Sequence, residues 1–269
     1  MKKPVLKFAS ITTVCLSVIL FSGCQSTDSR SGLKDPQKAL EVRTKMAAEF
    51  IRSGDVDSAK RTLDQALEAN PRHALANMMM GVLLQTEGSD ASLAQADRYF
   101  KRAVASEPKN AQIRNNYATY LYQLKRYPEA IENLTIAGST LGYDSRFRAL
   151  ENLATIYNEQ GDTVNAEKVY RQALQANRDS VVSMIGLAEI HYLRQELSNA
   201  QAYYDQAVRL VGQNNLNARA LWVGIRLARA QGDTTDMQVI VNQLRALFPS
   251  SPEYQRYLQL QYSTEAVWK

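Results

Sequence analysis

Few side chains in this 269-residue sequence are of types and spacings that support catalysis. The two histidines, His73 and His191, lie far apart in the chain, and neither belongs to a His, Cys, Asp and Glu cluster with metal-ligand spacing. No Gly-rich loop follows a strand-like segment, and no Ser or Cys stands in a nucleophile motif. The sequence therefore predicts a protein that is not an enzyme, with no cofactor, metal or small-molecule substrate. A hydrolase with an unrecognised site remains the alternative.

Cys24 has the clearest chemical role, and it follows a leader typical of export. Lys2 and Lys3 precede an apolar run at residues 8–21, which is too short to span a bilayer. The segment Leu20-Phe21-Ser22-Gly23-Cys24 resembles the bacterial lipobox, although Phe21 stands where Leu is usual. This resemblance implies a signal peptide over residues 1–23 and a lipid on the Cys24 thiol. An uncleaved anchor or a secretory signal with a free Cys24 thiol is disfavoured, because an Ala-x-Ala-like cleavage site is absent.

The residues after Cys24 indicate where the protein resides and how it is attached. Gln25 stands where enteric-type sorting places an Asp to retain lipoproteins at the inner membrane, so the resemblance implies the periplasmic face of the outer membrane. Residues 24–36 are polar and predict a flexible tether. The net charge of +5 falls to about +2 without the three leader lysines, and this balance does not favour a nucleic-acid partner.

Small residues recur through the rest of the chain at a period of 34 to 37 residues. The first series is Ala59, Ala96, Ala130, Ala166 and Ala200, with Met237 in place of the alanine in the sixth unit. A second series follows seven residues later, at Ala66, Ala103, Ala137, Ala173, Ala207 and Leu244. A large apolar residue lies between the two in each unit: Leu63, Phe100, Leu134, Tyr170, Tyr204 and Val241. Spacings of four and three residues predict one buried helix face per unit.

This pattern resembles the tetratricopeptide repeat (TPR), a unit of two antiparallel helices that approach closely where side chains are small. The resemblance implies an all-α fold over residues 37–262: a TPR solenoid of about six helix-turn-helix repeats that forms a right-handed superhelix. Residues 253–262 have apolar spacing suited to a C-terminal capping helix. Residues 263–269 are expected to form a short tail.

Function in such a solenoid is expected on the concave face, which the first helix of each repeat builds. In repeats one and two we predict a partner-binding groove with the apolar residues Ile51, Leu75, Met78 and Val82. Met46, Phe50, Met80 and Leu84 are expected to fill the core, so that packing does not require the groove residues to be apolar. The alternative is that the superhelix or the N-terminal segment covers these side chains.

A second candidate surface lies on the first helix of repeat six. Its expected inward residues are Arg219, Trp222, Arg226 and Arg229. Three guanidinium groups around an indole suit an acidic segment or a C-terminal carboxylate of a partner. A solvated basic face explains the same residues equally well.

The whole chain resembles the PilF/PilW family of type IV pilus biogenesis lipoproteins, which act as pilotins. The most specific phrases lie at residues 110–117, 121–130, 151–153, 217–221 with 224–228, and 249–255, and they include residues outside the repeat core. The resemblance implies a protein partner, the secretin subunit of the pilus, which the lipoprotein brings to the outer membrane for multimerisation. A TPR scaffold for outer-membrane protein assembly or for peptidoglycan enzymes is the alternative, because a fold alone does not choose a partner.

Overall fold

The computed structural model describes residues 35–263 and residue 268, and the regular structure in this part is helical. The chain divides into two units, Met1–Ala39 and Leu40–Lys269, and the described residues of the first are Asp35 and the start of α1. The predicted signal peptide, Cys24 and most of the predicted tether lie outside the described residues.

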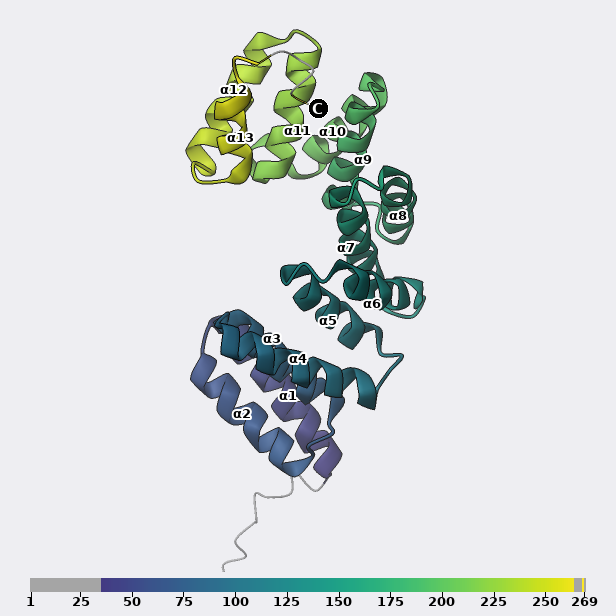
Figure 1. The fold of residues 1–269 in the computed structure, drawn as a ribbon, viewed down its shortest axis with the longest axis vertical. Helices are drawn as coiled ribbons and strands as arrows, with labels where there is room; N and C mark the ends of the chain where they lie inside the picture. The colour runs from purple at the N-terminus through teal and green to yellow at the C-terminus, as the bar shows by residue number, and fades with distance from the viewer. Residues whose placement is uncertain (1–34, 264–267, 269) are drawn as a thin grey trace, which may run out of the picture. The chain divides into compact units, whose positions relative to one another are not determined.

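The α-helices carry labels in Figure 1, and one short 3₁₀ helix is drawn there without a label. They are α1 (Pro36–Ser53), α2 (Val56–Ala69), α3 (Ala74–Glu87), α4 (Asp90–Ser106), α5 (Ala111–Gln123), α6 (Tyr127–Ser139), α7 (Arg146–Glu159), α8 (Thr163–Ala176), α9 (Val181–Leu193), α10 (Leu197–Val211), the short 3₁₀ helix η2 (Gln213–Asn215), α11 (Ala218–Ala230), α12 (Thr234–Leu247) and α13 (Pro252–Leu260).

These helices pack as consecutive pairs. α3 packs on α4, α5 on α6, α7 on α8, α9 on α10 and α11 on α12, while Leu40 and Ala47 of α1 share a core with Leu63 of α2. The first helices of neighbouring repeats also pack on one another, α3 on α5, α5 on α7, α7 on α9 and α9 on α11. α13 packs on α11 and α12. Within residues 35–263, six helix pairs and a terminal helix confirm the predicted all-α TPR solenoid.

The small residues lie at the crossings between helices. Every alanine of the two predicted series has 0% of its surface exposed, and the large residues between them are also buried. Two glycines at these crossings are required by an aromatic ring: a Cβ on Gly186 would lie 2.4 Å from the Tyr170 ring, and one on Gly224 would lie 2.2 Å from the Tyr204 hydroxyl. The aromatic residue of one repeat therefore reaches the backbone of the next.

Repeat one differs from the others at its outer side. The sequence predicts that Met46 fills the core, but this side chain is 47% exposed, and Val42 is 41% exposed. In repeat two the corresponding residues, Met80 and Ala76, are buried. That position packs against the second helix of the preceding repeat, and the described chain has no repeat before α1. The prediction that Met46 lies in the core was therefore wrong, because in the described chain no preceding repeat covers it.

Tight turns join the two helices within several repeats. Gly161 has a φ of +78°, in the left-handed region, and Asp162 then caps α8 by accepting a hydrogen bond from the Asn165 backbone N–H at 3.1 Å. Lys125 and Gln195 take the same left-handed conformation in repeats three and five, with φ of 57° and 63°. The turn geometry is therefore kept even where glycine is absent.

Replacing Gly161 with alanine is expected to lower the free energy of unfolding by about 1 kcal/mol, because an L side chain is strained at this φ. A Cβ there would meet no atom within 4 Å, so the loss reports backbone strain alone. Urea denaturation would measure it. Gly142→Ala is the matched control, since Gly142 also has open space around it but no left-handed φ. Equal stability of the two variants would contradict the prediction.

The C-terminal end of the solenoid is closed by aromatic packing. Trp268, in the predicted tail, is 0% exposed, stacks on Trp222 of α11 with ring centroids 5.3 Å apart, and meets the edge of Tyr257 of α13 at 6.1 Å. The Trp268 indole N–H donates to the Leu260 carbonyl at 2.9 Å. This residue is part of the last repeat's core and not of a free tail.

Candidate functional site

The surface built by the first helices α1, α3, α5, α7, α9 and α11, here called the first-helix face, carries both predicted sites. Helices α3 to α11 of this series contact one another in order, so their side chains form one continuous surface. It corresponds to the face that the sequence predicts to be concave.

The predicted groove in repeats one and two is only partly open. Ile51, Leu75 and Val82 are half-buried and pack against the hydrophobic core. Met78 is 2% exposed, so it is a core residue and not part of an open surface. The reason is that α3 lies inside the stack, between the first repeat and α5, and buries two sides of the helix. Three of the four predicted residues thus remain accessible, and their role in binding a partner stays a prediction.

The arginines of the second candidate surface are already paired. Glu189 of α9 accepts hydrogen bonds from Arg219 at 2.7 Å and from Arg226 at 2.6 Å, and Asn158 of α7 donates to the same carboxylate at 3.2 Å. Arg226 is 3% exposed and lies between two rings, 5.0 Å from the Tyr192 centroid and 5.4 Å from that of Trp222. The two ion pairs join repeats five and six, and the Asn158 hydrogen bond adds repeat four.

The protonation of Glu189 is set by these two cations. Burial alone raises the pKa of the Glu189 carboxyl, but the charges and hydrogen bonds of Arg219 and Arg226 outweigh it and lower the pKa to about 2. Glu189 is therefore ionised at neutral pH and holds both guanidinium groups in place.

The other two residues of this surface are covered from the C-terminal side. Trp222 is 4% exposed beneath Trp268. The Arg229 guanidinium lies 4.4 Å from the Trp268 ring and donates to the Ser263 carbonyl at 2.8 Å. An open basic face, expected as one explanation of these residues, is not what the structure shows.

A pocket of about 450 Å³ nevertheless opens beside them. Its charged lining residues are three acids and three bases: Glu159, Glu189, Glu253, Arg219, Arg226 and Arg256. The opposite charges balance, so this pocket does not favour an acidic partner over a neutral one.

Hydrogen bonds between polar side chains run along the first-helix face from one repeat to the next. Gln85 of α3 donates to Gln123 at 2.9 Å, and Tyr122 of α5 donates to Glu159 of α7. Burial and the Glu159 carboxylate raise the pKa of the Tyr122 hydroxyl, which keeps it a donor. Each bond joins residues 37 or 38 positions apart, close to the repeat period. Sequence analysis missed these pairs, although the period could have located them.

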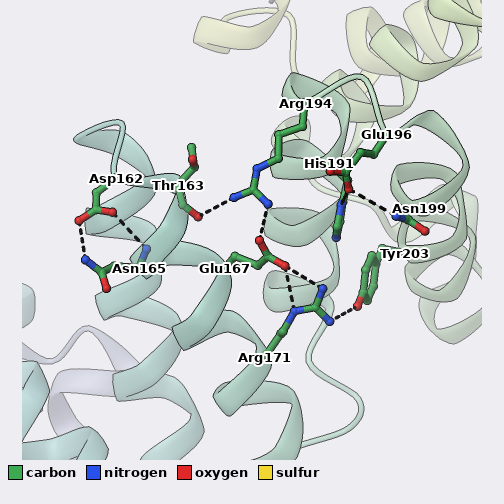
Figure 2. Close-up of polar contacts among 10 residues, drawn as sticks. All are labelled: Asp162, Thr163, Asn165, Glu167, Arg171, His191, Arg194, Glu196, Asn199 and Tyr203. Atoms are coloured by element: carbon green, nitrogen blue, oxygen red, sulfur yellow. Dashed lines mark hydrogen bonds and ion pairs between the residues drawn. The ribbon is translucent and has the colours of Figure 1, made fainter.

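A second polar network joins repeats four and five away from this face. Figure 2 shows Glu167 of α8 between two arginines: Arg171 on the same helix donates to it at 2.8 Å, and Arg194, after α9, donates to its other oxygen. Arg171 also donates to the Tyr203 hydroxyl of α10 at 2.9 Å. Burial raises the pKa of Glu167, but the two arginines outweigh it and lower the pKa.

His191 belongs to the same network and has a structural environment. Its ring stacks on Tyr203 with centroids 5.5 Å apart, and its Nδ1 pairs with the Glu196 carboxylate, which also accepts from Asn199. The other histidine, His73, caps α3: its Nδ1 accepts from the Ala76 backbone N–H at 3.2 Å. Both rings therefore hold helices in place.

Two negative findings apply to residues 35–263 and 268. In this range no group of three or more His, Cys, Asp or Glu side chains is placed to hold a metal ion. None of the helices described there is both long and apolar enough to cross a membrane.

Comparison with known proteins places the chain in a family. Two tetratricopeptide repeat models match it, one over residues 109–179 and the other over residues 44–92 and 152–215. The type IV pilus assembly protein PilF of Pseudomonas aeruginosa is 32% identical over 247 residues, which cover 91% of this chain and 96% of that protein. The chain belongs to the PilF/PilW family.

Solved structures of PilF/PilW proteins agree with this assignment. The structure of Pseudomonas aeruginosa PilF has a TM-score of 0.73 and 31% identity, and the match covers 83% of this chain and 98% of that one. PilW, described as a widely conserved type IV pilus biogenesis factor, has a TM-score of 0.69 and 26% identity, with 81% and 98% covered. The chain therefore shares its fold with both proteins over about four fifths of its length.

Proposed function

We propose that this chain is an outer-membrane lipoprotein that binds the secretin subunit of the type IV pilus and promotes its localisation and multimerisation. The observation that carries the proposal is the match to PilF over 91% of this chain and 96% of the relative. A match of that extent includes the surfaces as well as the repeat core. A face made of packed helices and paired charges fits the binding of a partner segment without net charge. It also fits a role without catalysis.

The first two repeats are the proposed binding region. Ile51, Leu75 and Val82 leave part of their apolar surface accessible on the first-helix face, and Val42 and Met46 are exposed on the outer side of α1. Apolar side chains in this number at one end of a solenoid favour an apolar partner segment.

The proposed mechanism combines this contact with a lipid. Acylated Cys24 would hold the protein on the periplasmic face of the outer membrane, and the segment up to α1 would act as the tether. A bound secretin subunit would then be kept at the membrane surface, where the raised local concentration favours assembly of its ring.

Replacing Leu75 and Val82 together with glutamate is expected to reduce secretin binding roughly tenfold or more, because each charge would be placed against an apolar contact. The measurement is capture of the secretin subunit from solubilised outer membranes by immobilised protein. Met78 is left unchanged, because it is buried and a charge at this position would disturb folding as well as binding.

Val164→Glu/Val239→Glu is the matched control, because these valines are 72% and 56% exposed on α8 and α12. Circular dichroism and urea titration must show that both variants fold. Equal capture by the two variants would move the site away from repeats one and two. If wild-type protein captures outer-membrane assembly factors or peptidoglycan enzymes and no secretin, the scaffold alternative is the better function.

A further inference from the structure

A small pocket lies on the first-helix face where repeats three and four meet, between α5 and α7. Its volume is about 160 Å³. Ala118, Leu134 and Ile156 form an apolar floor, and each of them is at most 1% exposed. A cavity of this size and lining can hold an aliphatic or benzene-sized group.

The pocket lies beside Leu134, which is smaller than the aromatic residues at the same position of three other repeats. The same position of repeats two, four and five holds Phe100, Tyr170 and Tyr204. The Phe100 ring packs on Tyr117 with centroids 5.5 Å apart, and the Tyr170 hydroxyl lies 3.1 Å from the hydroxyl of Thr155. An aromatic ring thus fills the equivalent space in those repeats, whereas the leucine leaves it empty.

The rim of the pocket is polar and accessible. Thr119 is exposed, and Tyr122, Asn152 and Thr155 are half-buried around the opening. The Asn152 amide donates to Asn115 of α5 across a long 3.4 Å contact. Such a contact is weak and is easily exchanged for a hydrogen bond to a ligand. Amide side chains can donate to and accept from a peptide backbone at the same time.

A wider cavity continues from this rim. It has a volume of about 530 Å³, shares Thr119 and Asn152 with the pocket, and extends past Asn115 to Val182 of α9. A chain that places one side chain in the pocket therefore has room to continue along the first-helix face.

We propose that this pocket binds one aliphatic side chain of an extended segment of a protein partner, and that Asn115 and Asn152 hold the backbone of that segment. The proposal deepens the proposed function, because it takes the partner to be a protein. An extended segment fits better than a helix, since a helix presents several apolar side chains and needs a broad apolar groove. Here a single apolar pocket is surrounded by polar groups.

Repeat two supplies the design of a variant with a filled pocket. There the Phe100 ring packs on Gly81, and a Cβ on Gly81 would lie 2.9 Å from that ring. Ala118 occupies the position of Gly81 in repeat three. The double variant Ala118→Gly/Leu134→Phe therefore places the ring in the pocket and removes the methyl group with which it would collide. Thr119→Trp blocks the opening from the exposed rim and leaves the core unchanged.

The test selects random peptides of about 12 residues, displayed on phage, on the wild-type protein and measures their affinity for each variant. We expect the selected peptides to share one position that holds Leu, Ile, Val or Met. Either variant should reduce their affinity roughly tenfold to a hundredfold, because that is the affinity gained by burying one such side chain. Gln238→Phe, an added ring at an exposed position of α12, is the control and should bind like wild type.

Peptides that bind all variants equally, or a selection that yields no peptide, would overturn the inference. The purified secretin subunit, measured against the same variants, separates the inference from the proposed function. Secretin bound equally by wild type and both pocket variants would remove this pocket from its binding and leave the proposed function standing. Peptides that discriminate while secretin fails to bind would support the pocket and reject the secretin partner.

Discussion

Glu189→Gln is expected to lower the free energy of unfolding by about 3 kcal/mol, because it leaves two arginines without their counter-charge. Arg226 is 3% exposed and cannot regain its solvation without opening the packing between α9 and α11. The measurement is urea denaturation at neutral pH. Glu151→Gln is the matched control: burial raises the pKa of Glu151, whose carboxylate accepts from Ser180, so loss of its charge should cost little.

The same variant has a defined dependence on pH. The pKa of Glu189 is lowered from 4.5 to about 2 in the folded state, so its contribution is complete above the unfolded value and is lost as the pH falls toward 2. The stability difference between wild type and Glu189→Gln should therefore be constant above about pH 5 and shrink below it. A difference that stays constant down to pH 3 would show that the ion pairs do not stabilise the fold.

Gly186→Ala is expected to destabilise the protein by about 2 kcal/mol, because the new methyl group would lie within 2.4 Å of the Tyr170 ring. Tyr170 is 0% exposed and cannot turn toward solvent. In repeat three a leucine, Leu134, stands at the equivalent of Tyr170, with Asn152 in the place of Gly186.

A double-mutant cycle separates this collision from the helix propensity of alanine. In a Tyr170→Leu background the Gly186→Ala change should cost less than about 1 kcal/mol, which urea denaturation can measure. Gly142→Ala, where a Cβ meets no atom within 4 Å, is expected to leave stability nearly unchanged. An equal cost of Gly186→Ala in both backgrounds would exclude the collision as its cause.

The repeats were predictable from sequence because their signal is local and recurs. Ala59 and Ala66, with Leu63 between them, lie on one helix face. The same spacing recurs in five further units, which was enough to predict the fold class. Burial of a single residue was less predictable. Met46 and Met80 occupy the same repeat position, yet one is 47% exposed and the other 1%, because among the described residues only Met80 has a preceding repeat to pack against.

Whether the residues of the candidate sites are paired, open or buried depended even more on contacts between repeats. Arg219 and Arg226 were expected on the correct face, but their pairing with Glu189 depends on which residues of α9 and α11 come together. The pocket above Leu134 is visible only when side-chain sizes are compared across repeats. Trp268 follows the last recognisable repeat residue, so periodicity carried no information about its burial.

The two ends of the solenoid differ in how completely they are closed, and this sets where the structure opens first. Trp268 and α13 cover the last repeat, whereas Val42 and Met46 of the first remain in contact with solvent. In a stack stabilised by contacts between neighbours, a terminal repeat with one neighbour has the lowest cost of local opening, and within residues 35–263 no helix precedes α1 to cover repeat one. Amide hydrogens of α1 and α2 should thus exchange faster than those of α9 and α11. The repeat that comes directly after the tether is also the one best able to rearrange around a partner.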